Sequence, residues 1–411
     1  MQLYQHQKDA IRAGITKKKY AIYHEQGLGK SLTAIAIAKF SVLKENIDEI
    51  YIVCPAFLKH NWAAEIEKFQ PDLLLNFKIF SYEMFMKIPA AVRNKIQFLI
   101  VDEAHYIRNR KTLRTNAVVT TSMTAKRVLL LTGTPVGNSS ILDLYTHLVC
   151  LNHRHPYAQY RAFFKEFADK LATRGGFPII RAKNETKFLE IISEYSERKT
   201  KIDCLDLPDK VYVEIPAKGT KVQQDTHIIH KLMAQEGFSF EVTHPDTGAV
   251  IQTFEEHEQK LNILLDLLET LDGAQVTIFC AFRKSIPFIM DGIKKKLKAK
   301  CVAFYGELSD EKRIQIIDDF RSNRAQYLVA TMQALNAGVT LVNCHNVVYY
   351  SRSFSCIERA QSEDRFHRIG QVNKVTYYDI VANGFDKKAF DLINSRQSYD
   401  NIKKQLECYE D

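Results

Sequence analysis

A glycine-rich segment near the N-terminus is the first place where residue types and spacing indicate chemistry. The segment HEQGLGKS (24–31) follows an apolar, β-rich run (19–23) and precedes a stretch with helical spacing (30–40). Such a turn between a strand and a helix presents backbone amides and a helix N-terminus to phosphate groups. His24 stands where the full phosphate-loop pattern has glycine, so the string taken alone is also compatible with a chance match.

Five residues of this turn have predicted roles in a nucleotide site. They are Gly27, Leu28, Gly29, Lys30 and Ser31. The two glycines permit the tight turn. The lysine is expected between the β- and γ-phosphates of ATP, and the serine hydroxyl is expected to ligate Mg²⁺. ATP and Mg²⁺ are therefore the predicted ligands.

Two carboxylates at the end of a later apolar run strengthen this prediction. The run QFLIV (97–101) leads directly into Asp102 and Glu103. Asp102 is predicted to hold Mg²⁺ through its water shell, and Glu103 to polarise the water that attacks the γ-phosphate. A solvated acidic turn is the alternative, but the apolar run favours a buried strand that delivers both groups to a site.

A small hydroxyl-bearing segment ends the next apolar run, RVLLLT. It consists of Thr132, Gly133 and Thr134, followed by Pro135. Hydroxyl groups at this place can link a nucleotide site to a neighbouring lobe, whereas an ordinary turn with glycine and proline explains the string equally well. Both interpretations stay open at this point.

Positive charge for the same chemistry is found in the C-terminal half, in IERAQSEDRFHRIGQ (357–371). The spacing predicts a helix on which Arg365 and Arg368 share one face, with Gln361 one turn before Arg365. Arginines from a second domain stabilise the charge that develops during phosphoryl transfer. These three residues are predicted to be catalytic, although a solvated basic helix would be the better interpretation without the glycine-rich turn.

The elements that must position these residues follow one pattern, repeated in each half of the chain. Short apolar runs alternate with helical stretches, which is typical of parallel α/β sheets. The predicted strands are KYAIY, EIYIVC, QFLIVD and RVLLLT, and later QVTIFCAF, AKCVAFY, QYLVAT, NVVYYS and VTYYDIVA. We predict an α/β fold with two lobes, residues 1–216 and 256–411, a helical insertion from about 150, and a linker over 217–255.

Bulk composition limits the class of protein only broadly. The chain has 411 residues, 46% hydrophobic and 26% charged, and a net charge of +9, which suits a folded protein with a polyanionic partner. No run approaches the roughly eighteen apolar residues of a membrane helix, so a cytosolic or nuclear-type compartment is expected. The eight cysteines contain no CxxC pair and are interpreted as reduced packing residues.

Taken in order, HEQGLGKS, IVDEAH, LLLTGTP and QSEDRFHRIGQ resemble the motifs of the Swi/Snf-like ATPases of helicase superfamily two. The segments LYQHQ, IVCPAFLKHNWAAEIEKF and YGELSDEKRIQIIDDF extend the resemblance over nearly the whole chain. HRIGQ and the stretch Pro55–Trp62 are specific to this branch, and the motif details look closest to fork-remodelling, strand-annealing members. The resemblance implies two RecA-like lobes with ATP in the cleft between them.

The resemblance also implies individual contacts. Gln7 looks like the glutamine that reads adenine. Residues that look like contacts to the DNA backbone are Pro55, Lys59, Phe282, Arg283 and Thr331.

The function that the resemblance implies is an ATP-driven motor that moves along double-stranded DNA or remodels DNA and its bound proteins. We expect a monomer without a membrane partner, of a compact bacterial or phage type. The alternative is a single-strand or RNA helicase of the DEAH type, which would be expected to read QRxGRxGR in the second lobe. A third interpretation is a binding module with a decayed ATP site, against which the intact Lys30, Asp102 and Glu103 argue.

Overall fold

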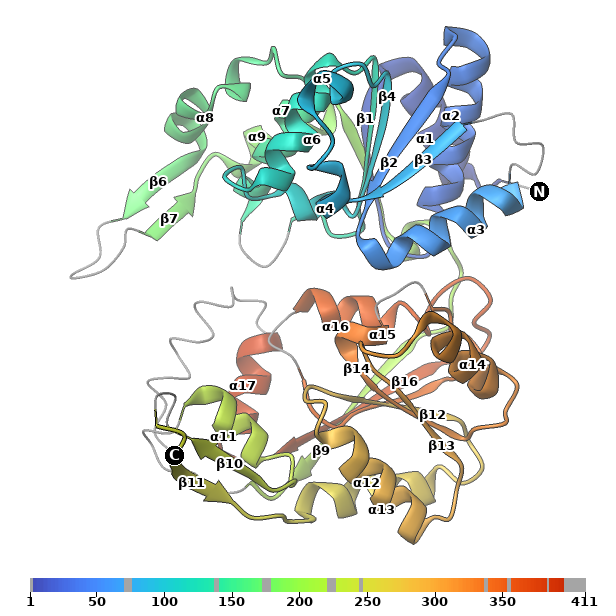
Figure 1. Cartoon of the computed structure of the whole chain (residues 1–411), viewed down its shortest axis with the longest axis vertical. Coiled ribbons are helices and arrows are strands. Elements are labelled where there is room, and N and C mark those ends of the chain that lie inside the picture. Colours follow the sequence, from blue (N-terminus) through green and yellow to red (C-terminus); the bar gives the residue numbers. More distant parts are fainter. Residues whose placement is uncertain are drawn as a thin grey trace. The chain divides into compact units, whose positions relative to one another are not determined.

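The computed structural model describes residues 3–69, 76–136, 140–171, 179–219, 227–243, 247–335, 339–352, 356–382 and 384–394 (Figure 1). The chain divides into two compact units, residues 1–206 and 207–411. Each unit has its own parallel sheet and its own apolar core.

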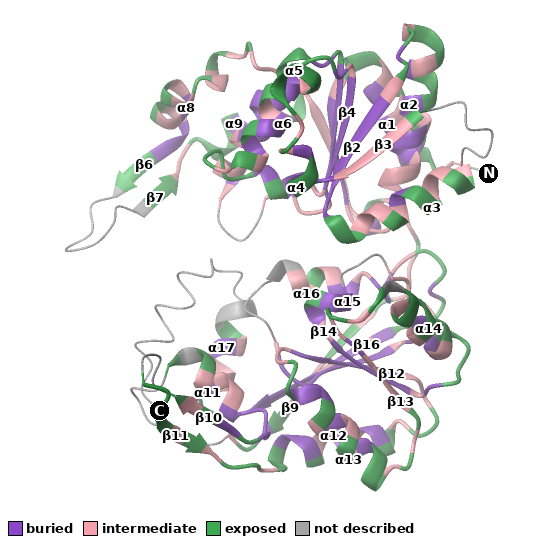
Figure 2. Ribbon diagram, in the orientation of Figure 1, coloured by how far each residue is buried: buried purple, intermediate pink, exposed green. Residues whose placement is uncertain are grey.

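The first unit is built on a six-stranded sheet in the order β3-β2-β4-β5-β1-β8. All its strand pairs are parallel. The strands are β1 (Lys19–His24), β2 (Glu49–Cys54), β3 (Asn76–Ser81), β4 (Phe98–Asp102), β5 (Arg127–Leu131) and β8 (Ser196–Lys199). Because helices cover both faces, the central strands are nearly continuous apolar runs, and β4 and β5 are buried at every position. Figure 2 shows the buried β4.

The helices of the first unit form two layers. On one face lie α1 (Gln5–Lys17), α2 (Lys30–Glu45) and α3 (Lys59–Phe69), which contribute Ala10, Ile37 and Trp62 to a core with Phe98. The other face carries α4 (Tyr82–Phe85), α6 (Leu113–Thr124), α7 (Tyr145–Leu151), α8 (Tyr160–Phe167) and α9 (Glu185–Ser193).

Short elements complete this unit. They are α5 (Ala90–Arg93), α10 (Lys201–Cys204), the 3₁₀ turns η1 (Ala56–Leu58), η2 (Ala104–Ile107), η3 (Ile141–Leu144) and η4 (Pro156–Ala158), and the antiparallel pair β6 (Ala168–Leu171) and β7 (Ile179–Ala182). Figure 1 shows β6 and β7 projecting from the helical layer.

The second unit repeats the design with the strand order β13-β14-β12-β15-β16-β9, again all parallel. Its strands are β9 (Lys210–Ala217), β12 (Val276–Cys280), β13 (Cys301–Phe304), β14 (Tyr327–Thr331), β15 (Asn346–Tyr349) and β16 (Val375–Ala382). Its helices are α11 (Ile228–Ala234), α12 (Gln259–Thr270), α13 (Ser285–Lys296), α14 (Asp310–Arg321), α15 (Met332–Leu335), α16 (Cys356–Glu363) and α17 (Phe385–Asn394). A separate hairpin pairs β10 (Phe240–Thr243) with β11 (Val250–Phe254).

The predicted α/β class with two parallel sheets is confirmed, and every strand predicted from an apolar run is present. The predicted end of the first lobe at 216 does not coincide with the division after 206. The reason is that β9 pairs along its whole length with β16 of the second sheet. The region of the predicted helical insertion also contains the hairpin of β6 and β7 and the strand β8, which extends the first sheet beside β1. The hairpin of β10 and β11 lies in the predicted linker.

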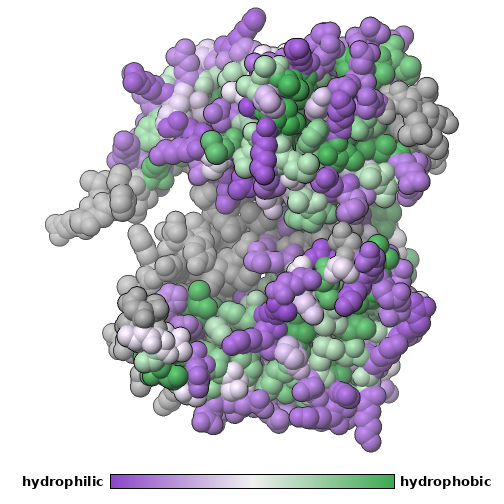
Figure 3. Space-filling model, viewed as in Figure 1, coloured by the Kyte–Doolittle hydropathy of each residue, from purple (hydrophilic) through white to green (hydrophobic). Residues whose placement is uncertain are grey.

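The surface and the interior differ as expected for such layers. On the face shown in Figure 3, hydrophilic side chains are spread over each unit with smaller hydrophobic groups between them.

No helix within the described ranges has the length and apolar character needed to cross a bilayer. Cys54, Cys150, Cys280 and Cys344 are buried, and these four together with Cys204 and Cys301 are free thiols.

Candidate active site

The predicted chemistry-bearing segments of the first unit all lie at one edge of its sheet. The glycine-rich turn follows β1, the carboxylate pair ends β4, and Thr132 follows β5. Because the strands are parallel, their carboxyl ends meet at the same edge, and β5 pairs with both β1 and β4. This is the edge at which open α/β sheets bind ligands.

The glycine-rich turn has the backbone of a phosphate-binding loop. Gly27 and Gly29 have φ values of 87° and 76°, in the left-handed region that glycine adopts at little cost. A Cβ atom on Gly29 would also lie 2.3 Å from Nε2 of Gln7, so a side chain there would require the end of the Gln7 side chain to move. Helix α2 begins at Lys30, which places its free amides beside the turn.

Contacts from the neighbouring backbone hold the lysine of the turn. Lys30 Nζ donates to the carbonyl oxygens of His24 at 2.9 Å and Glu25 at 3.2 Å. The buried His24 ring contacts Glu197 Oε1 of β8 at 2.7 Å through Nε2. Burial lowers the pKa of His24, although Glu197 opposes this shift. The histidine that replaces the expected glycine thus joins the turn to the edge strand.

Helix α1 closes the turn from the other side. Gln7 is buried, and its Nε2 donates to the carbonyl oxygen of Leu28 at 3.2 Å, while His6 Nε2 contacts the same oxygen at 3.0 Å. The structure therefore brings Gln7 together with the glycine-rich turn. Adenine recognition by Gln7 remains a prediction.

The two carboxylates at the end of β4 differ in environment. Asp102 is 8% exposed, and its Oδ1 accepts a hydrogen bond from the backbone amide of Glu103 at 2.9 Å. Burial, together with the charge of Glu103, raises the pKa of Asp102 to about 6, while Trp62 and Lys30 oppose this rise. Asp102 is buried and is repelled by the charge of Glu103, so a nearby cation would favour its ionised form. Such a carboxylate is a good ligand for a cation.

Glu103 adopts an unusual backbone conformation. Its φ of 49° lies in the left-handed region, which costs a residue other than glycine about 1–3 kcal/mol. Such strain is typical of positions where function fixes the direction of a side chain. Glu103 Oε2 lies 3.3 Å from Nδ1 of His105, which also lies 3.1 Å from Thr132 Oγ1. Thr132 therefore contacts the carboxylate segment rather than forming an isolated turn.

Side chains that sequence reasoning did not assign hold this carboxylate segment in place. Trp62 Nε1 donates to Asp102 Oδ2 at 2.8 Å. The hydroxyl of Tyr82 donates to the carbonyl oxygen of Asp102 at 2.8 Å. His147 contacts the carbonyl oxygen of Ala104 at 3.1 Å. Only the position of Trp62 in a branch-specific segment gave any signal of a special role.

The residues present fit a magnesium–nucleotide complex. Mg²⁺ in nucleotide sites keeps several waters and uses one or two protein ligands plus phosphate oxygens. Ser31 at the start of α2 and Asp102 at the end of β4 are the predicted ligands, and they lie at the same sheet edge. No cluster of three or more His, Cys, Asp or Glu suited to a metal occurs among the residues that the structure describes.

The predicted arginine helix of the second unit is shorter than expected. Helix α16 ends at Glu363, so it contains Gln361, but Arg365 and Arg368 lie in the turns that follow. The shared helical face predicted for the two arginines is therefore wrong. The side chain of Phe366 is buried in the core, and the carbonyl oxygen of Arg365 accepts from the amide of Leu341 at 2.8 Å instead of continuing the helix.

These turns are fixed by tertiary contacts. Arg365 is 9% exposed, and Arg368 Nη1 donates to Thr340 Oγ1 at 2.8 Å. The buried Gln371 donates through Nε2 to the carbonyl oxygens of Val342 and Phe366, both at 3.1 Å. The final glutamine of HRIGQ thus stabilises the turn that carries the arginines, a role that sequence reasoning did not foresee.

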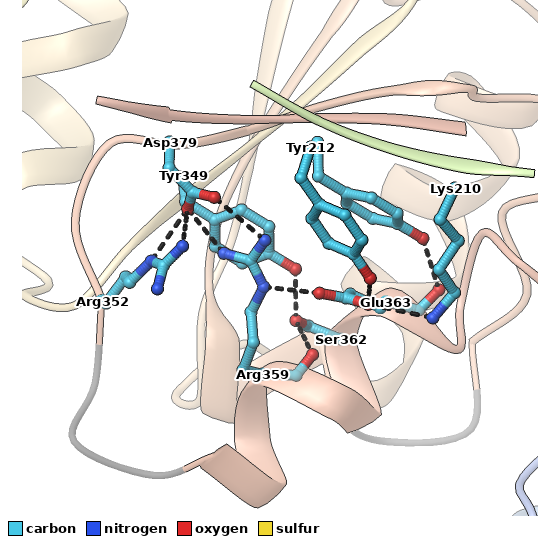
Figure 4. A network of polar contacts seen from close by, with 9 residues as sticks. Lys210, Tyr212, Tyr349, Arg352, Arg359, Ser362, Glu363 and Asp379 are labelled. Atoms are coloured by element: carbon cyan, nitrogen blue, oxygen red, sulfur yellow. Dashed lines mark hydrogen bonds and ion pairs between the residues drawn. The ribbon is translucent and has the colours of Figure 1, made fainter. Parts of the chain in front are cut away.

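A buried polar network anchors α16 to the sheet (Figure 4). Arg359 of α16 donates to Asp379 of β16 at 2.6 and 3.2 Å, and to Glu363 at 2.7 Å. Its guanidinium lies 3.4 Å from the ring centre of Tyr349. Lys210 of β9 donates to Glu363 at 2.9 Å. Burial opposes ionisation of Glu363, yet Arg359 and Lys210 hold its pKa below the ordinary value.

Comparison with known proteins gives matches over both units. The SNF2-related domain family matches residues 75–262, and the helicase conserved C-terminal domain matches residues 259–370. The chain contains an SNF2-related domain followed by a helicase C-terminal domain. The predicted family is confirmed, and the alternative of a DEAH-type helicase is wrong. Because the match to the SNF2-related domain begins after the glycine-rich turn, the assignment of that turn rests on its own geometry.

Curated relatives agree with the family but are much longer than this SNF2-related chain. The DNA annealing helicase and endonuclease ZRANB3 of Bos taurus is 23% identical over 95% of the chain and 39% of the relative. The SWI/SNF-related matrix-associated actin-dependent regulator of chromatin subfamily A-like protein 1 of Xenopus tropicalis is 26% identical over 92% of the chain and 42% of the relative. The chain therefore spans about two fifths of these relatives. The resemblance to strand-annealing members is confirmed.

One solved structure is similar over nearly the whole chain. The Sulfolobus solfataricus SWI2/SNF2 ATPase core in complex with dsDNA is 21% identical, with a TM-score of 0.45, and the match covers 99% of this chain and 93% of that one.

The predicted DNA contacts of the SNF2-related chain lie at the carboxyl ends of strands. Pro55 follows β2, and Lys59 begins α3, where it lines an open groove of about 400 Å³ with Ser81 and Met84. In the second unit, Thr331 ends β14. DNA contact by these residues is untested by the fold.

Two of these predicted contacts have structural partners within the second unit. Phe282 packs against the small core of α11 and β10. Arg283 forms an ion pair with Glu307 and lies over the ring of Tyr305 at 4.8 Å. A DNA role for either residue would compete with these contacts.

Proposed function

We propose that this SNF2-related chain hydrolyses ATP with Mg²⁺ and uses the energy to translocate on double-stranded DNA. The observation that carries the proposal is the sheet edge of the first unit. There a phosphate-loop turn with left-handed glycines, a lysine at a helix start, the buried Asp102 and the left-handed Glu103 occur together.

The residues of this edge have distinct proposed roles. The amides at the start of α2 and Lys30 would bind the phosphates, and Ser31 and Asp102 would hold Mg²⁺, which supplies charge neutralisation on the phosphates. Glu103, held in a fixed direction by its backbone, would orient and polarise the attacking water. His105 would fix the Glu103 carboxylate through their 3.3 Å contact.

Arg365 and Arg368 would stabilise the charge that develops on the γ-phosphate. Two features support this role. The arginines immediately follow a helix that a buried ion network holds in place, and Arg368 presents part of its side chain at the surface, where its Nη1 contacts Thr340. Gln361, which is half-buried on α16, would support the same site.

Double-stranded DNA is the proposed track. Relatives that the chain matches are named as DNA annealing helicases, and the chain carries a net charge of +9. We further propose that proteins bound to DNA are displaced or remodelled during movement, and that the chain acts as a monomer. Contacts to the DNA backbone position a protein without reading bases, so no sequence preference is expected.

The test is ATP turnover measured with no nucleic acid, duplex DNA, single-stranded DNA and RNA. Strong stimulation by duplex is expected, with less by single strands and RNA. Stimulation by RNA alone would contradict the proposal. Duplex affinity measured at increasing salt should fall with a log–log slope of about −0.9 for each phosphate neutralised. Triplex displacement then distinguishes translocation from simple binding, because displacement requires ATP hydrolysis.

A further inference from the structure

The side chain of Trp62 makes a direct contact with the predicted catalytic machinery. Trp62 lies on α3 and is 2% exposed, and its indole Nε1 donates to Asp102 Oδ2 at 2.8 Å. An indole can only donate, and its buried N–H needs an acceptor. Hydrogen bonds to an ionised acceptor are about twice as strong as neutral ones. The contact is therefore a specific restraint on the carboxylate rather than general packing.

The two oxygens of Asp102 are restrained from different directions. Oδ2 accepts from Trp62, and Oδ1 accepts from the backbone amide of Glu103 at 2.9 Å. Two donors on two oxygens fix the rotation of the carboxylate about its own axis. Each oxygen keeps further acceptor capacity, because an ionised carboxylate offers about four lone-pair sites. The remaining sites are left for a cation or its water shell.

The same tryptophan connects Asp102 to another part of the first unit. Helix α3 begins at Lys59, one turn before Trp62, and packs against α2, the helix that starts with Lys30. The element that carries a predicted DNA contact thus also carries the donor to Asp102. A shift of α3 would change the geometry of the carboxylate through a single hydrogen bond.

We propose that Trp62 is a positioning residue that sets the orientation of the Asp102 carboxylate and ties it to α3. This inference rests on the proposed function, because it concerns the carboxylate that would hold Mg²⁺. It assigns to the tryptophan an effect on turnover and metal-dependent binding that a core residue without this bond would not have.

The test uses the fact that the chain contains a single tryptophan. Growth of a tryptophan auxotroph on β-(3-benzothienyl)alanine replaces the indole N–H with sulfur at this one position and leaves the shape nearly unchanged. Loss of a hydrogen bond to a charged group should lower the duplex-stimulated kcat about tenfold or more, with KM for ATP within about twofold. Unchanged kcat would overturn the proposal.

A second variant and a matched control separate positioning from stability. Trp62→Phe should lower kcat in the same way. Phe98→Leu truncates another fully buried side chain of the same core without touching Asp102. It should lower the thermal midpoint while leaving kcat within about twofold. If Phe98→Leu and Trp62→Phe lose kcat equally at equal loss of stability, Trp62 is a packing residue and the proposal fails.

Binding provides a readout apart from turnover. Emission from Trp62 in the unmodified chain should change when ADP is added with Mg²⁺, and should change little when ADP is added with EDTA. No difference between the two additions would overturn the proposal. The proposed function is tested independently of the Trp62 inference, and it fails if the unmodified chain shows no ATP turnover with duplex DNA. An active unmodified chain and an equally active benzothienyl form would reject only the inference about Trp62.

Discussion

The two units hold their charged residues by different means. In the first unit several contacts of the predicted site are local in sequence, although Asp102 also accepts a hydrogen bond from Trp62 of α3. Lys30 is held by the carbonyl oxygens of His24 and Glu25, and Asp102 by the amide of the next residue. In the second unit the charged residues are held by partners distant in sequence. Asp379 pairs with Arg352 and Arg359, and Glu363 pairs with Lys210.

This difference shows which part of each site depends on the whole fold. A strand, a turn and a helix start form the backbone of the phosphate loop, and Gln7 of α1 and Glu197 of β8 support it. The arginine turns need β9, β15 and β16 in place, because the network of Figure 4 joins all three strands to α16. Mutations in the first site should therefore mainly change the rate of hydrolysis. Mutations around the arginine turns should also lower the stability of the second unit.

The largest effect is expected at Glu103 of the first unit. Glu103→Gln keeps the shape of the side chain but removes the charge that polarises water, so hydrolysis should fall by roughly 100- to 10,000-fold. Binding of ATP and duplex DNA should persist. Steady-state turnover and nucleotide binding measure the two parts. Glu83→Gln, at an exposed carboxylate of α4, is the control and should turn over normally. Undiminished turnover in Glu103→Gln would assign water activation to another residue.

The corresponding change in the second unit is Arg368→Ala. Removal of a guanidinium that stabilises transition-state charge should slow hydrolysis about a thousandfold, with little loss of ATP affinity. Thr340→Val is the matched variant, because it removes the 2.8 Å contact but keeps the guanidinium, and it should cost much less. Single-turnover hydrolysis and ATP binding provide the measurements. Equal losses in both variants would show that Arg368 acts by holding the turn.

Features of both units that depend on neighbouring residues could be predicted from the sequence. Apolar runs reveal buried strands, so β2 and β16 have the predicted bounds. Ser309 caps α14, with its side chain accepting from the amide of Lys312. These features depend on local periodicity and local hydrogen bonds.

Features that depend on distant partners were missed. Nothing in the segment 357–371 reveals that burial of Phe366 ends the helix before Arg365. The sequence likewise does not show that β9 pairs with β16 or that Trp62 reaches Asp102, because such contacts are fixed only when the sheet forms. The left-handed conformation of Glu103 is hidden for the same reason.

Asp379→Asn tests the dependence of the second unit on its ion network. The change leaves Arg352 and Arg359 without their full counter-charge, and breaking a buried pair costs about 3–5 kcal/mol. Hydrogen exchange in β15 and β16 should show this loss. Asp209→Asn removes the exposed partner of Lys374 and should cost less than about 1 kcal/mol.

The Asp379→Asn variant also tests whether the two units unfold independently. Trp62, the single tryptophan, reports on the first unit, so its unfolding transition in urea should stay unchanged in Asp379→Asn. A shift of the Trp62 transition as large as the loss in β15 and β16 would show that the two units unfold together.

The smallest expected effect is a pH dependence confined to the first unit. Burial lowers the pKa of His147 to about 4, although its contact with the carbonyl oxygen of Ala104 opposes the shift. Its unfolded pKa is near 6.5, so the unfolded chain binds the proton first as the pH falls. The stabilisation by neutral His147 is therefore complete above pH 6.5 and is lost as the pH falls from 6.5 to about 4.

His147→Gln should remove this contribution, which reaches at most about 1.4 kcal/mol per pH unit. The free energy of unfolding, followed by Trp62 fluorescence in urea at pH 7.5, 6 and 5, should therefore fall less steeply with pH in the variant. Part of the slope should remain, because the pKa of His24 is also lowered by burial. Tyr23→Phe removes the 2.8 Å contact to His147 Nδ1 but keeps the imidazole, so it should lower stability and retain the slope. If both variants keep the slope of the unmodified chain, His147 is not the group that makes the first unit acid-sensitive.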